Sequence, residues 1–142
     1  MEISIDIELA TTEAERTIGL MHRRQLPENK GMLFIFPQAG NHAFWNKNVN
    51  FPLSLGFFDD QNKLVAIKDM EAQSPISVSA NNNRIKFVLE ANQGFFSKNN
   101  INLGSTFVDI KRIIQKEEKR GLSEKIDFKD SYNFNHVVVL GV

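Results

Sequence analysis

The chain contains no cysteine, which excludes disulfides, thiolate metal sites and a cysteine nucleophile. It also lacks any apolar run near the ~20 residues of a membrane helix, so no membrane span is expected. Basic and acidic side chains balance at 17 each, which gives the chain no overall electrostatic reason to bind nucleic acid. No basic and apolar leader precedes the first expected strand. These absences predict a cytoplasmic protein, or an exported one whose leader has been removed.

Apolar side chains are plentiful. Hydrophobic residues make up 42 % of the 142 residues, which is enough for one domain with a single core. Phenylalanine supplies 12 of the aromatic side chains, against one tryptophan and one tyrosine. The sequence therefore predicts a globular protein whose core is bulky and has few polar groups.

Strand patterns dominate the first 110 residues. Apolar and polar residues alternate over residues 2–9, which predicts a strand with one buried face. Short apolar runs predict further strands at 31–36, 42–47, 53–58, 63–68, 84–90 and 105–110. Pro37 is expected to end the first of these runs. The turn at 59–62 predicts a hairpin between its two neighbouring strands, and the polar stretch 74–83 predicts a loop.

Two short helices are expected among these strands. Thr12 and Glu15 have the spacing of a capping box, so a helix is predicted over about 12–22, weakened by Gly19. A second short helix is expected near 92–99. The fold class is therefore α+β and mainly β, with a small barrel-like antiparallel or mixed sheet and one or two short helices.

The last 32 residues have a different pattern. Residues 109–121 predict a helix with a narrow apolar stripe, 122–136 look irregular, and HVVVLGV at 136–142 is strongly prone to form a strand. We therefore expect a β-rich domain at 1–110 and a C-terminal extension at 111–142. The extension packs on the same domain or on a partner, and its strand joins the sheet or pairs with another chain.

Sequence templates for catalysis are missing. There is no GxSxG, GxGxxG or P-loop motif, and the three histidines show no HxH or HxxxH spacing. Ser54 falls in an expected strand, and Asp59 with Asp60 suits a turn better than an acid pair. These templates predict no catalytic residue, no cofactor and no metal site.

The stretch FWNKNVNFP at 44–52 contains the only tryptophan, next to a lysine and two asparagines. If this stretch is extended, Trp45 and Lys47 project together from one face near a strand end. They could form part of a binding site with Asn48. Alternatively, Trp45 fills the core and Lys47 extends over it, and the sequence favours this alternative. Arg23, just past the first helix, could grip an anion or tie down a loop.

Three blocks of the sequence resemble a known family. They are GLMHRRQLPENKGMLFIFP (19–37), HAFWNKNVNFPLSLGFFDDQNKLVAI (42–67) and FVLEANQGFFSKNNINLGSTF (87–107). Their order is similar to that of the bacterial and archaeal family known as domain of unknown function 192, over about residues 3–110. The resemblance implies a barrel-like, mainly β domain and no particular reaction. The polar positions of the family pattern correspond here to Arg23, Trp45, Lys47 and Asn48. The resemblance implies a shared role for Arg23 and Lys47, either in binding or in the architecture.

The chain departs from the family pattern at several polar positions. Asn46 stands where the pattern has methionine, and Val49 where it has threonine. Ser54 and Ser105 each replace an aspartate, and the loop at 73–75 lacks a cysteine that many members carry. If those carboxylates served acid–base or metal chemistry in relatives, this chain should lack it. If they only fixed turns, serine can take their place by bonding the backbone.

These observations favour a non-enzymatic binding or accessory domain for a small polar or anionic ligand, either saccharide-like or bearing a carboxylate or phosphate. The expected ligand-binding residues are Arg23, Trp45, Lys47 and Asn48, because two cations lie near an aromatic ring without a nucleophile or base. One alternative is a protein-interaction module that binds a partner, or a second copy of itself, through residues 136–142. Another alternative is a degenerate or uncommon enzyme.

Overall fold

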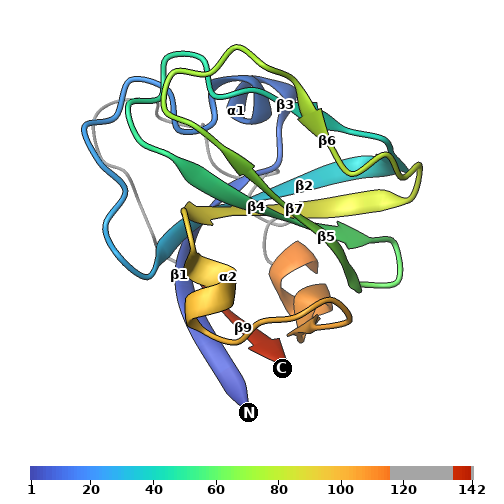
Figure 1. The fold of residues 1–142 in the computed structure, drawn as a ribbon. Coiled ribbons are helices and arrows are strands. Elements are labelled where there is room, and N and C mark those ends of the chain that lie inside the picture. Colours follow the sequence, from blue (N-terminus) through green and yellow to red (C-terminus); the bar gives the residue numbers. More distant parts are fainter. Residues whose placement is uncertain (116–135, 142) are drawn as a thin grey trace.

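The structure is a computed structural model, and it describes residues 1–115 and 136–141 (Figure 1). Helices and strands follow in the order β1 (Glu2–Ala10), α1 (Glu13–Ile18), β2 (Lys30–Gly40), β3 (Ala43–Phe44), β4 (Leu53–Asp59), β5 (Leu64–Met70), β6 (Val78–Ser79), β7 (Ile85–Asn92), α2 (Phe95–Lys98), β8 (Thr106–Val108) and β9 (His136–Gly141). Residues 110–115 form a further short helical segment.

Seven of the described strands form one curled sheet in the order β5-β4-β7-β2-β1-β9-β8. β1 and β2 are parallel, and the other neighbouring pairs are antiparallel. β3 and β6 form a small second sheet. The predicted α+β, mainly β class with a barrel-like mixed sheet is therefore confirmed, as are the β4–β5 hairpin and the C-terminal strand. No helix among the described residues is long and apolar enough to span a membrane.

Local chemistry explains where several elements begin and end. α1 starts at the predicted capping box, in which Thr12 accepts a hydrogen bond from the backbone N–H of Glu15 and the Glu15 side chain bonds back. It stops at Ile18, earlier than predicted, because Gly19 adopts a φ of +50° that does not continue a helix.

Two strand predictions were wrong. β2 continues past Pro37 because the pairing of β2 with β7 shifts between Ile35 and Gly40, and a bulge tolerates a residue without an N–H. The strand expected at 42–47 is limited to β3, which pairs with β6 inside the region predicted to be a loop. The backbone turns at Asn46, whose carbonyl accepts a hydrogen bond from the Val49 N–H.

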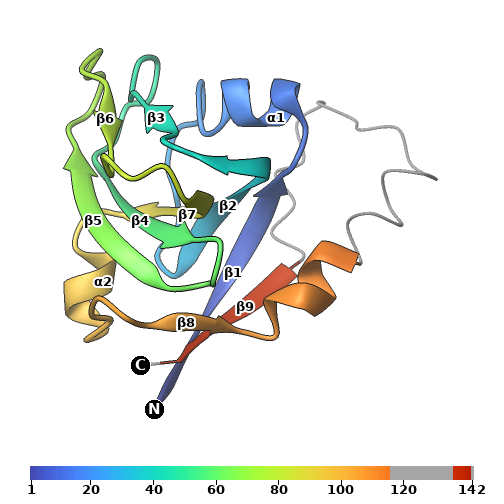
Figure 2. The same cartoon turned by 90° about the vertical axis from the view of Figure 1, so that its right-hand side faces the viewer.

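β9 lies between β1 and β8 in the sheet (Figure 2). It pairs with β1 along its whole length and with β8 through residues 139–141. Of the helix predicted over 109–121, residues 110–115 are helical. Residue 109 is in a turn. The remainder of that prediction, 116–121, and all but the last residue of the irregular segment expected at 122–136 fall outside the described residues, and residue 136 begins β9.

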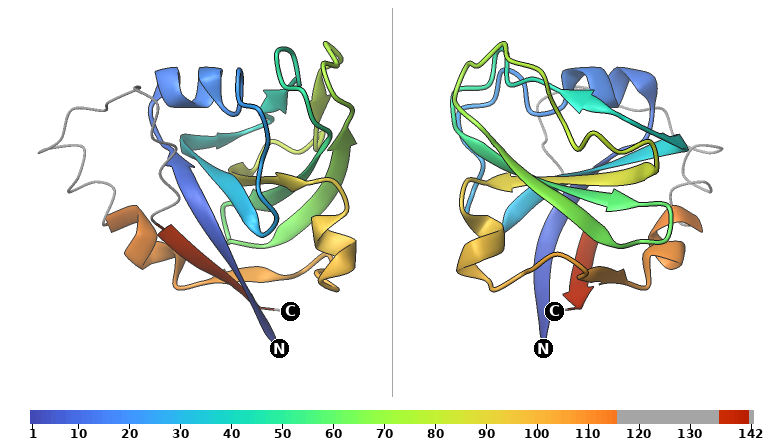
Figure 3. Two further views of the ribbon diagram at one scale, coloured as in Figure 1. Left: turned by 90° about the vertical axis from the view of Figure 1, so that its left-hand side faces the viewer. Right: turned by 45° about the vertical axis from the view of Figure 1, so that its right-hand side comes forward.

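The sheet buries side chains on both faces. One core, the α2-side core, is formed by apolar residues that include Leu33, Phe58, Leu89, Phe96 and Phe107. The other, the α1-side core, includes Leu20, Phe34, Leu55, Phe57 and Val88. Figure 3 shows α2 and the helical segment 110–115 on one side of the curled sheet and α1 on the other. Along β7, Phe87 and Leu89 point into the α2-side core, whereas Val88 belongs to the α1-side core. Because side chains alternate along a strand, Glu90 is also directed towards α1.

The curl brings the two edges of the sheet together at the β4–β5 turn. The Leu64 N–H donates to the Ser105 carbonyl, and the Gly104 N–H donates to the Leu64 carbonyl, both at 2.8 Å. The side chain of Asn62 completes the contact, because it donates to the Phe107 carbonyl at 2.7 Å and accepts from the Phe107 N–H at 3.1 Å. One amide side chain thus pairs with β8 as a neighbouring strand would.

Asn62→Asp is expected to lower the free energy of unfolding by about 1–3 kcal/mol. Aspartate tolerates the φ of +65° at this position and keeps the acceptor, but it loses the donor to the Phe107 carbonyl. Asn82→Asp is the matched control, because the Asn82 oxygen bonds the Arg84 N–H and an aspartate oxygen can do the same. Urea unfolding checks the prediction, and equal effects of the two substitutions would contradict it.

Candidate functional site

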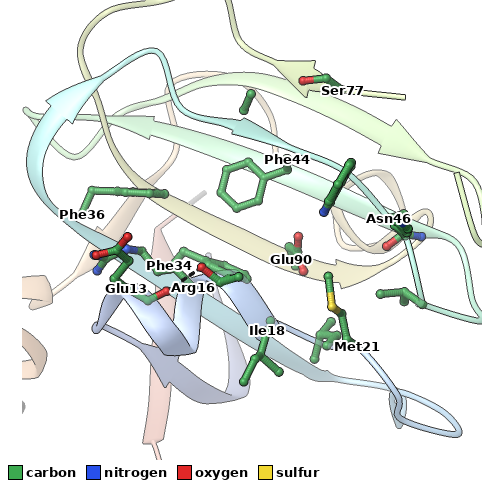
Figure 4. A pocket seen from close by; sticks show the side chains of 17 residues that line it. Glu13, Arg16, Ile18, Met21, Phe34, Phe36, Phe44, Asn46, Ser77 and Glu90 are labelled. Atoms are coloured by element: carbon green, nitrogen blue, oxygen red, sulfur yellow. Dashed lines mark hydrogen bonds between the residues drawn. The ribbon is translucent and has the colours of Figure 1, made fainter. Parts of the chain in front are cut away.

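A pocket of about 390 Å³ lies between α1 and the β3 region, above the α1-side core (Figure 4). Its size falls in the range of small-molecule sites. Its wall combines aromatic and aliphatic side chains with a few polar groups, and consists of Glu13, Arg16, Thr17, Ile18, Gly19, Leu20, Met21, Phe34, Phe36, Ala43, Phe44, Trp45, Asn46, Lys47, Val49, Ser77 and Glu90.

Arg16 and Gly19 hold one wall in place. The Arg16 guanidinium donates to the carbonyls of Thr11 and Ile35 at 2.6 and 3.0 Å, and lies 5.3 Å from the centre of the Phe36 ring. These contacts fasten α1 to β2. A Cβ atom at Gly19 would come within 3.3 Å of the Phe34 ring, so the chain turns here close to the aromatic wall.

Phe44 is the centre of the aromatic wall. Its ring packs edge-on against Phe34, Phe36 and Phe57, with centroids 5.1, 6.0 and 6.0 Å apart. Such edge-to-face pairs are the favoured arrangement for aromatic rings. β3 is short, but this packing fixes the position of its backbone and hence of the residues that follow.

Asn46 forms the turn beside this wall and is 1 % exposed. Its side-chain nitrogen donates to the carbonyls of Phe51 and Glu71, at 3.0 and 2.9 Å. Both partners are acceptors, so the other amide atom must be the oxygen. That oxygen, Oδ1, is buried and has no hydrogen-bond partner among the described residues. Asn46, a residue that lines the pocket, therefore carries a buried acceptor without a donor among the described residues.

Glu90 lines the pocket from β7 and is 4 % exposed. It lies opposite Met32 on β2 and Leu55 on β4, so its neighbours across the sheet are apolar. Burial raises the pKa of Glu90 from 4.5 to about 8. No described group donates a hydrogen bond to its carboxyl. Glu90 is therefore mostly protonated at neutral pH, at a site open to a ligand.

Trp45 and Lys47 lie together at the pocket mouth. Trp45 is 50 % exposed, and the Lys47 ammonium nitrogen is 5.4 Å from the centre of its ring. The alternative in which Trp45 fills the core is wrong, because Phe44 supplies the inward aromatic side chain and Trp45 follows it on the opposite side.

Arg23 and Asn48 do not line the pocket. Arg23 is 6 % exposed and forms an ion pair with Glu8 on β1 at 2.5 Å. Asn48 has a φ of +63°, its N–H donates to the Gln73 side chain, and its carbonyl accepts from the His22 N–H. The structure brings Trp45 and Lys47 together, and the pocket's arginine is Arg16.

Glu90, Asn46, Phe44 and Arg16 are pocket residues that the sequence did not single out. The pattern RIKFVLE indicates alternation and leaves Glu90 on the face expected to be polar. β7 is a central strand between β4 and β2, and both of its faces are covered. One feature of the sequence did indicate that this face is buried. Val88 lies on the same face as Glu90 and is apolar, as expected for a strand covered on both faces.

Ser54, one of the serines that replace a carboxylate of the family pattern, has a structural contact. Its hydroxyl donates to Asp69 at 2.7 Å and accepts from the Gly94 N–H at 3.0 Å. Gly94 is the N-cap residue that precedes α2. Ser54 therefore links the β4–β5 hairpin to α2, on the side of the sheet away from the pocket.

The curled sheet, the short helices and the pocket beside α1 define a small, mainly β domain. Comparisons with known proteins identify its family. The chain belongs to the family described as Uncharacterized ACR, COG1430 (DUF192), whose pattern matches residues 1–108. No curated protein matches the chain.

Two solved structures are similar to this fold. One is a protein from Sinorhizobium meliloti 1021 named as a candidate transcription regulator, with 29 % identity, a TM-score of 0.66, and coverage of 69 % of this chain and 76 % of that one. The other is a protein of unknown function from Novosphingobium aromaticivorans DSM 12444, with 28 % identity, a TM-score of 0.68, and coverage of 72 % and 73 %. Their names assign no ligand.

Proposed function

We propose that this protein is a non-enzymatic binding domain whose α1-side pocket takes a small polar ligand. The observation that carries the proposal is the buried carboxyl of Glu90, which lines an open pocket and has no partner among the described residues. Burying a polar group without a hydrogen bond lowers stability, so its retention in a cavity favours a role in recognition.

The mouth of the pocket also suits a ligand. Trp45, Ile18 and Ile76 are exposed hydrophobic residues, and Ile76 adjoins the pocket residue Ser77. Contiguous exposed apolar patches mark binding sites, and two of these residues, Trp45 and Ile18, line this pocket. The ring of Trp45 offers a flat stacking surface, and Lys47 can hold an anionic group at the rim.

Binding is favoured over catalysis because Glu90 has no second reactive group beside it. The wall has no histidine, and the Thr17 hydroxyl already donates to the Glu13 carbonyl at 2.8 Å. Arg16 is occupied by two carbonyls. A general acid or base acts with a nucleophile or an electrophilic group in reach, and no described side chain of the wall is hydrogen-bonded to the Glu90 carboxyl.

A fragment screen by thermal shift and NMR tests the proposal. We expect hits that perturb the amide signals of the pocket wall and bind Trp45→Ala about three- to tenfold more weakly, because a stacking surface is lost. Lys47→Ala is expected to weaken anionic hits, and Lys68→Ala is the control, since Lys68 is exposed on β5 and does not line the pocket. Hits that bind all variants equally would contradict this site.

The alternative of a protein-interaction module has less support. β9 already has β1 on one side and β8 on the other, so a partner would have to displace β8 or pair along 136–138. The neighbour from S. meliloti is named as a candidate transcription regulator, but the net charge of this chain is zero. We therefore keep the small-ligand proposal.

A further inference from the structure

Resting on the proposed function, we infer that the ligand carries an ammonium group, which enters the pocket and pairs with the Glu90 carboxylate against the aromatic wall. Two residues of the wall carry a polar group without a partner among the described residues. One is Asn46, whose amide oxygen is buried and unpaired. The other is Glu90, whose carboxyl is affected by burial alone, with no hydrogen bond or charge of a described residue acting on it. An ionised carboxylate and an amide oxygen are both acceptors. The complementary group is a donor, and a primary ammonium has three.

The described charged groups around Glu90 do not supply this donor. On α1, the Arg16 guanidinium bonds two carbonyls, and Glu13 is itself acidic. Lys47 lies over the Trp45 ring at the mouth. His42 stacks on Phe36 at 3.6 Å and bonds the Gln38 carbonyl. The pocket therefore holds an unpaired acid, and a bound cation would pair with it.

The walls favour an organic cation over a metal ion. A metal ion held by oxygen ligands needs several of them, and the described residues include no cluster of three or more acidic or histidine side chains that could hold one. Phe34, Phe36 and Phe44 line the same pocket as Glu90 (Figure 4). Aromatic rings attract ammonium groups and also pack against the apolar part of the same molecule. Lys47 near Trp45 is an example of this contact within the chain.

Binding of the ammonium is coupled to release of a proton. At pH 7 the Glu90 carboxyl is mostly protonated, because burial raises its pKa to about 8. Pairing with a cation requires the ionised form, so one proton leaves Glu90 for the solvent when the ligand binds. Only the ionised fraction is competent to bind, and the affinity is therefore expected to rise about tenfold between pH 6 and pH 7.

The experiment uses three probes of one shape, namely benzylammonium, the neutral benzyl alcohol and the anionic benzoate. The full chain is titrated with each at pH 6 and pH 7 by calorimetry, in two buffers of different ionisation enthalpy, and by NMR. Variants are Glu90→Gln and, as the control, Glu2→Gln, because Glu2 is exposed at the start of β1 and does not line the pocket.

We expect benzylammonium to perturb the pocket signals and to bind about tenfold more tightly at pH 7 than at pH 6. It should release close to one proton. Glu90→Gln should weaken binding more than about tenfold and abolish the pH dependence, because the charge-assisted bond is lost. Glu2→Gln should bind the probes with the same affinity and pH dependence as the wild type.

Other results overturn the inference. If benzyl alcohol or benzoate binds in the pocket and benzylammonium does not, the ligand is not a cation, while the proposed binding function stands. If benzylammonium binds with equal affinity to wild type and Glu90→Gln, Glu90 is not its partner. If no probe and no fragment perturbs the pocket signals, the inference and the proposed function both fail.

Discussion

Glu90→Gln is expected to raise the free energy of unfolding, by roughly 2–4 kcal/mol at pH 7. In the folded state the pKa of Glu90 is about 8, and its usual value is 4.5. At a pH between 4.5 and 8, Glu90 is ionised in the unfolded chain and protonated in the folded protein. The unfolded state then binds fewer protons, so stability is highest below about pH 4.5 and falls as the pH rises towards 8. Glutamine does not titrate and avoids this loss.

Urea unfolding of wild type and Glu90→Gln at pH 5, 7 and 8 measures the effect. The difference between the two proteins should be small at pH 5 and grow by about 1.4 kcal/mol for each pH unit up to about 8. Glu2→Gln, an exposed substitution, should follow the wild type. A constant difference between wild type and Glu90→Gln would show that Glu90 titrates normally.

Gly56→Ala is expected to destabilise the protein by about 2–3 kcal/mol, through overpacking of the α2-side core. A Cβ atom at Gly56 would lie 2.6 and 2.8 Å from two ring atoms of Phe96 and 3.2 Å from Leu64. Phe96 cannot swing away easily, because it is 1 % exposed and packs against Phe95 at 5.4 Å. The strand or α2 must shift instead.

Denaturant unfolding with a double-mutant cycle tests this origin. Phe96→Leu alone leaves a cavity and should be destabilising. In the Gly56→Ala background, Phe96→Leu removes the clash. The loss of unfolding free energy in the double variant should therefore be smaller than the sum of the two single losses by more than about 1 kcal/mol, as is typical for residues in contact. Gly40→Ala is the control, because its nearest neighbour would be His42 at 3.4 Å. Additive effects would exclude a direct clash.

Local patterns were sufficient for much of the fold. The alternation over 2–9 predicted β1, and the spacing of Thr12 and Glu15 predicted the start of α1. These predictions succeeded because the interactions join residues near each other in the chain. The extension of β2 past Pro37 depends on a bulge opposite β7, a strand distant in sequence, and was not predictable from the residues around Pro37.

The site was less predictable for the same reason. The sequence indicated that Trp45 and Lys47 project together, and the structure has them side by side at the pocket mouth. The burial of Glu90 depends on α1, more than 70 residues earlier in the chain, and no local pattern encodes it. Arg23 was predicted to bind the same ligand as Lys47, but it pairs with Glu8 on β1 and does not line the pocket. Long-range packing decides which polar residues share a cavity.

The position of β9 has a consequence for how the protein is made. Ile7 of β1 pairs with His136, so one edge of β1 has no partner until the ribosome has released residues 136–141. At ordinary rates of synthesis this interval is roughly ten seconds. During that time β1 presents unpaired N–H and C=O groups, which can pair with other nascent chains. The sheet is therefore completed after translation of β9, and a chaperone that shields the edge of β1 would act in this interval.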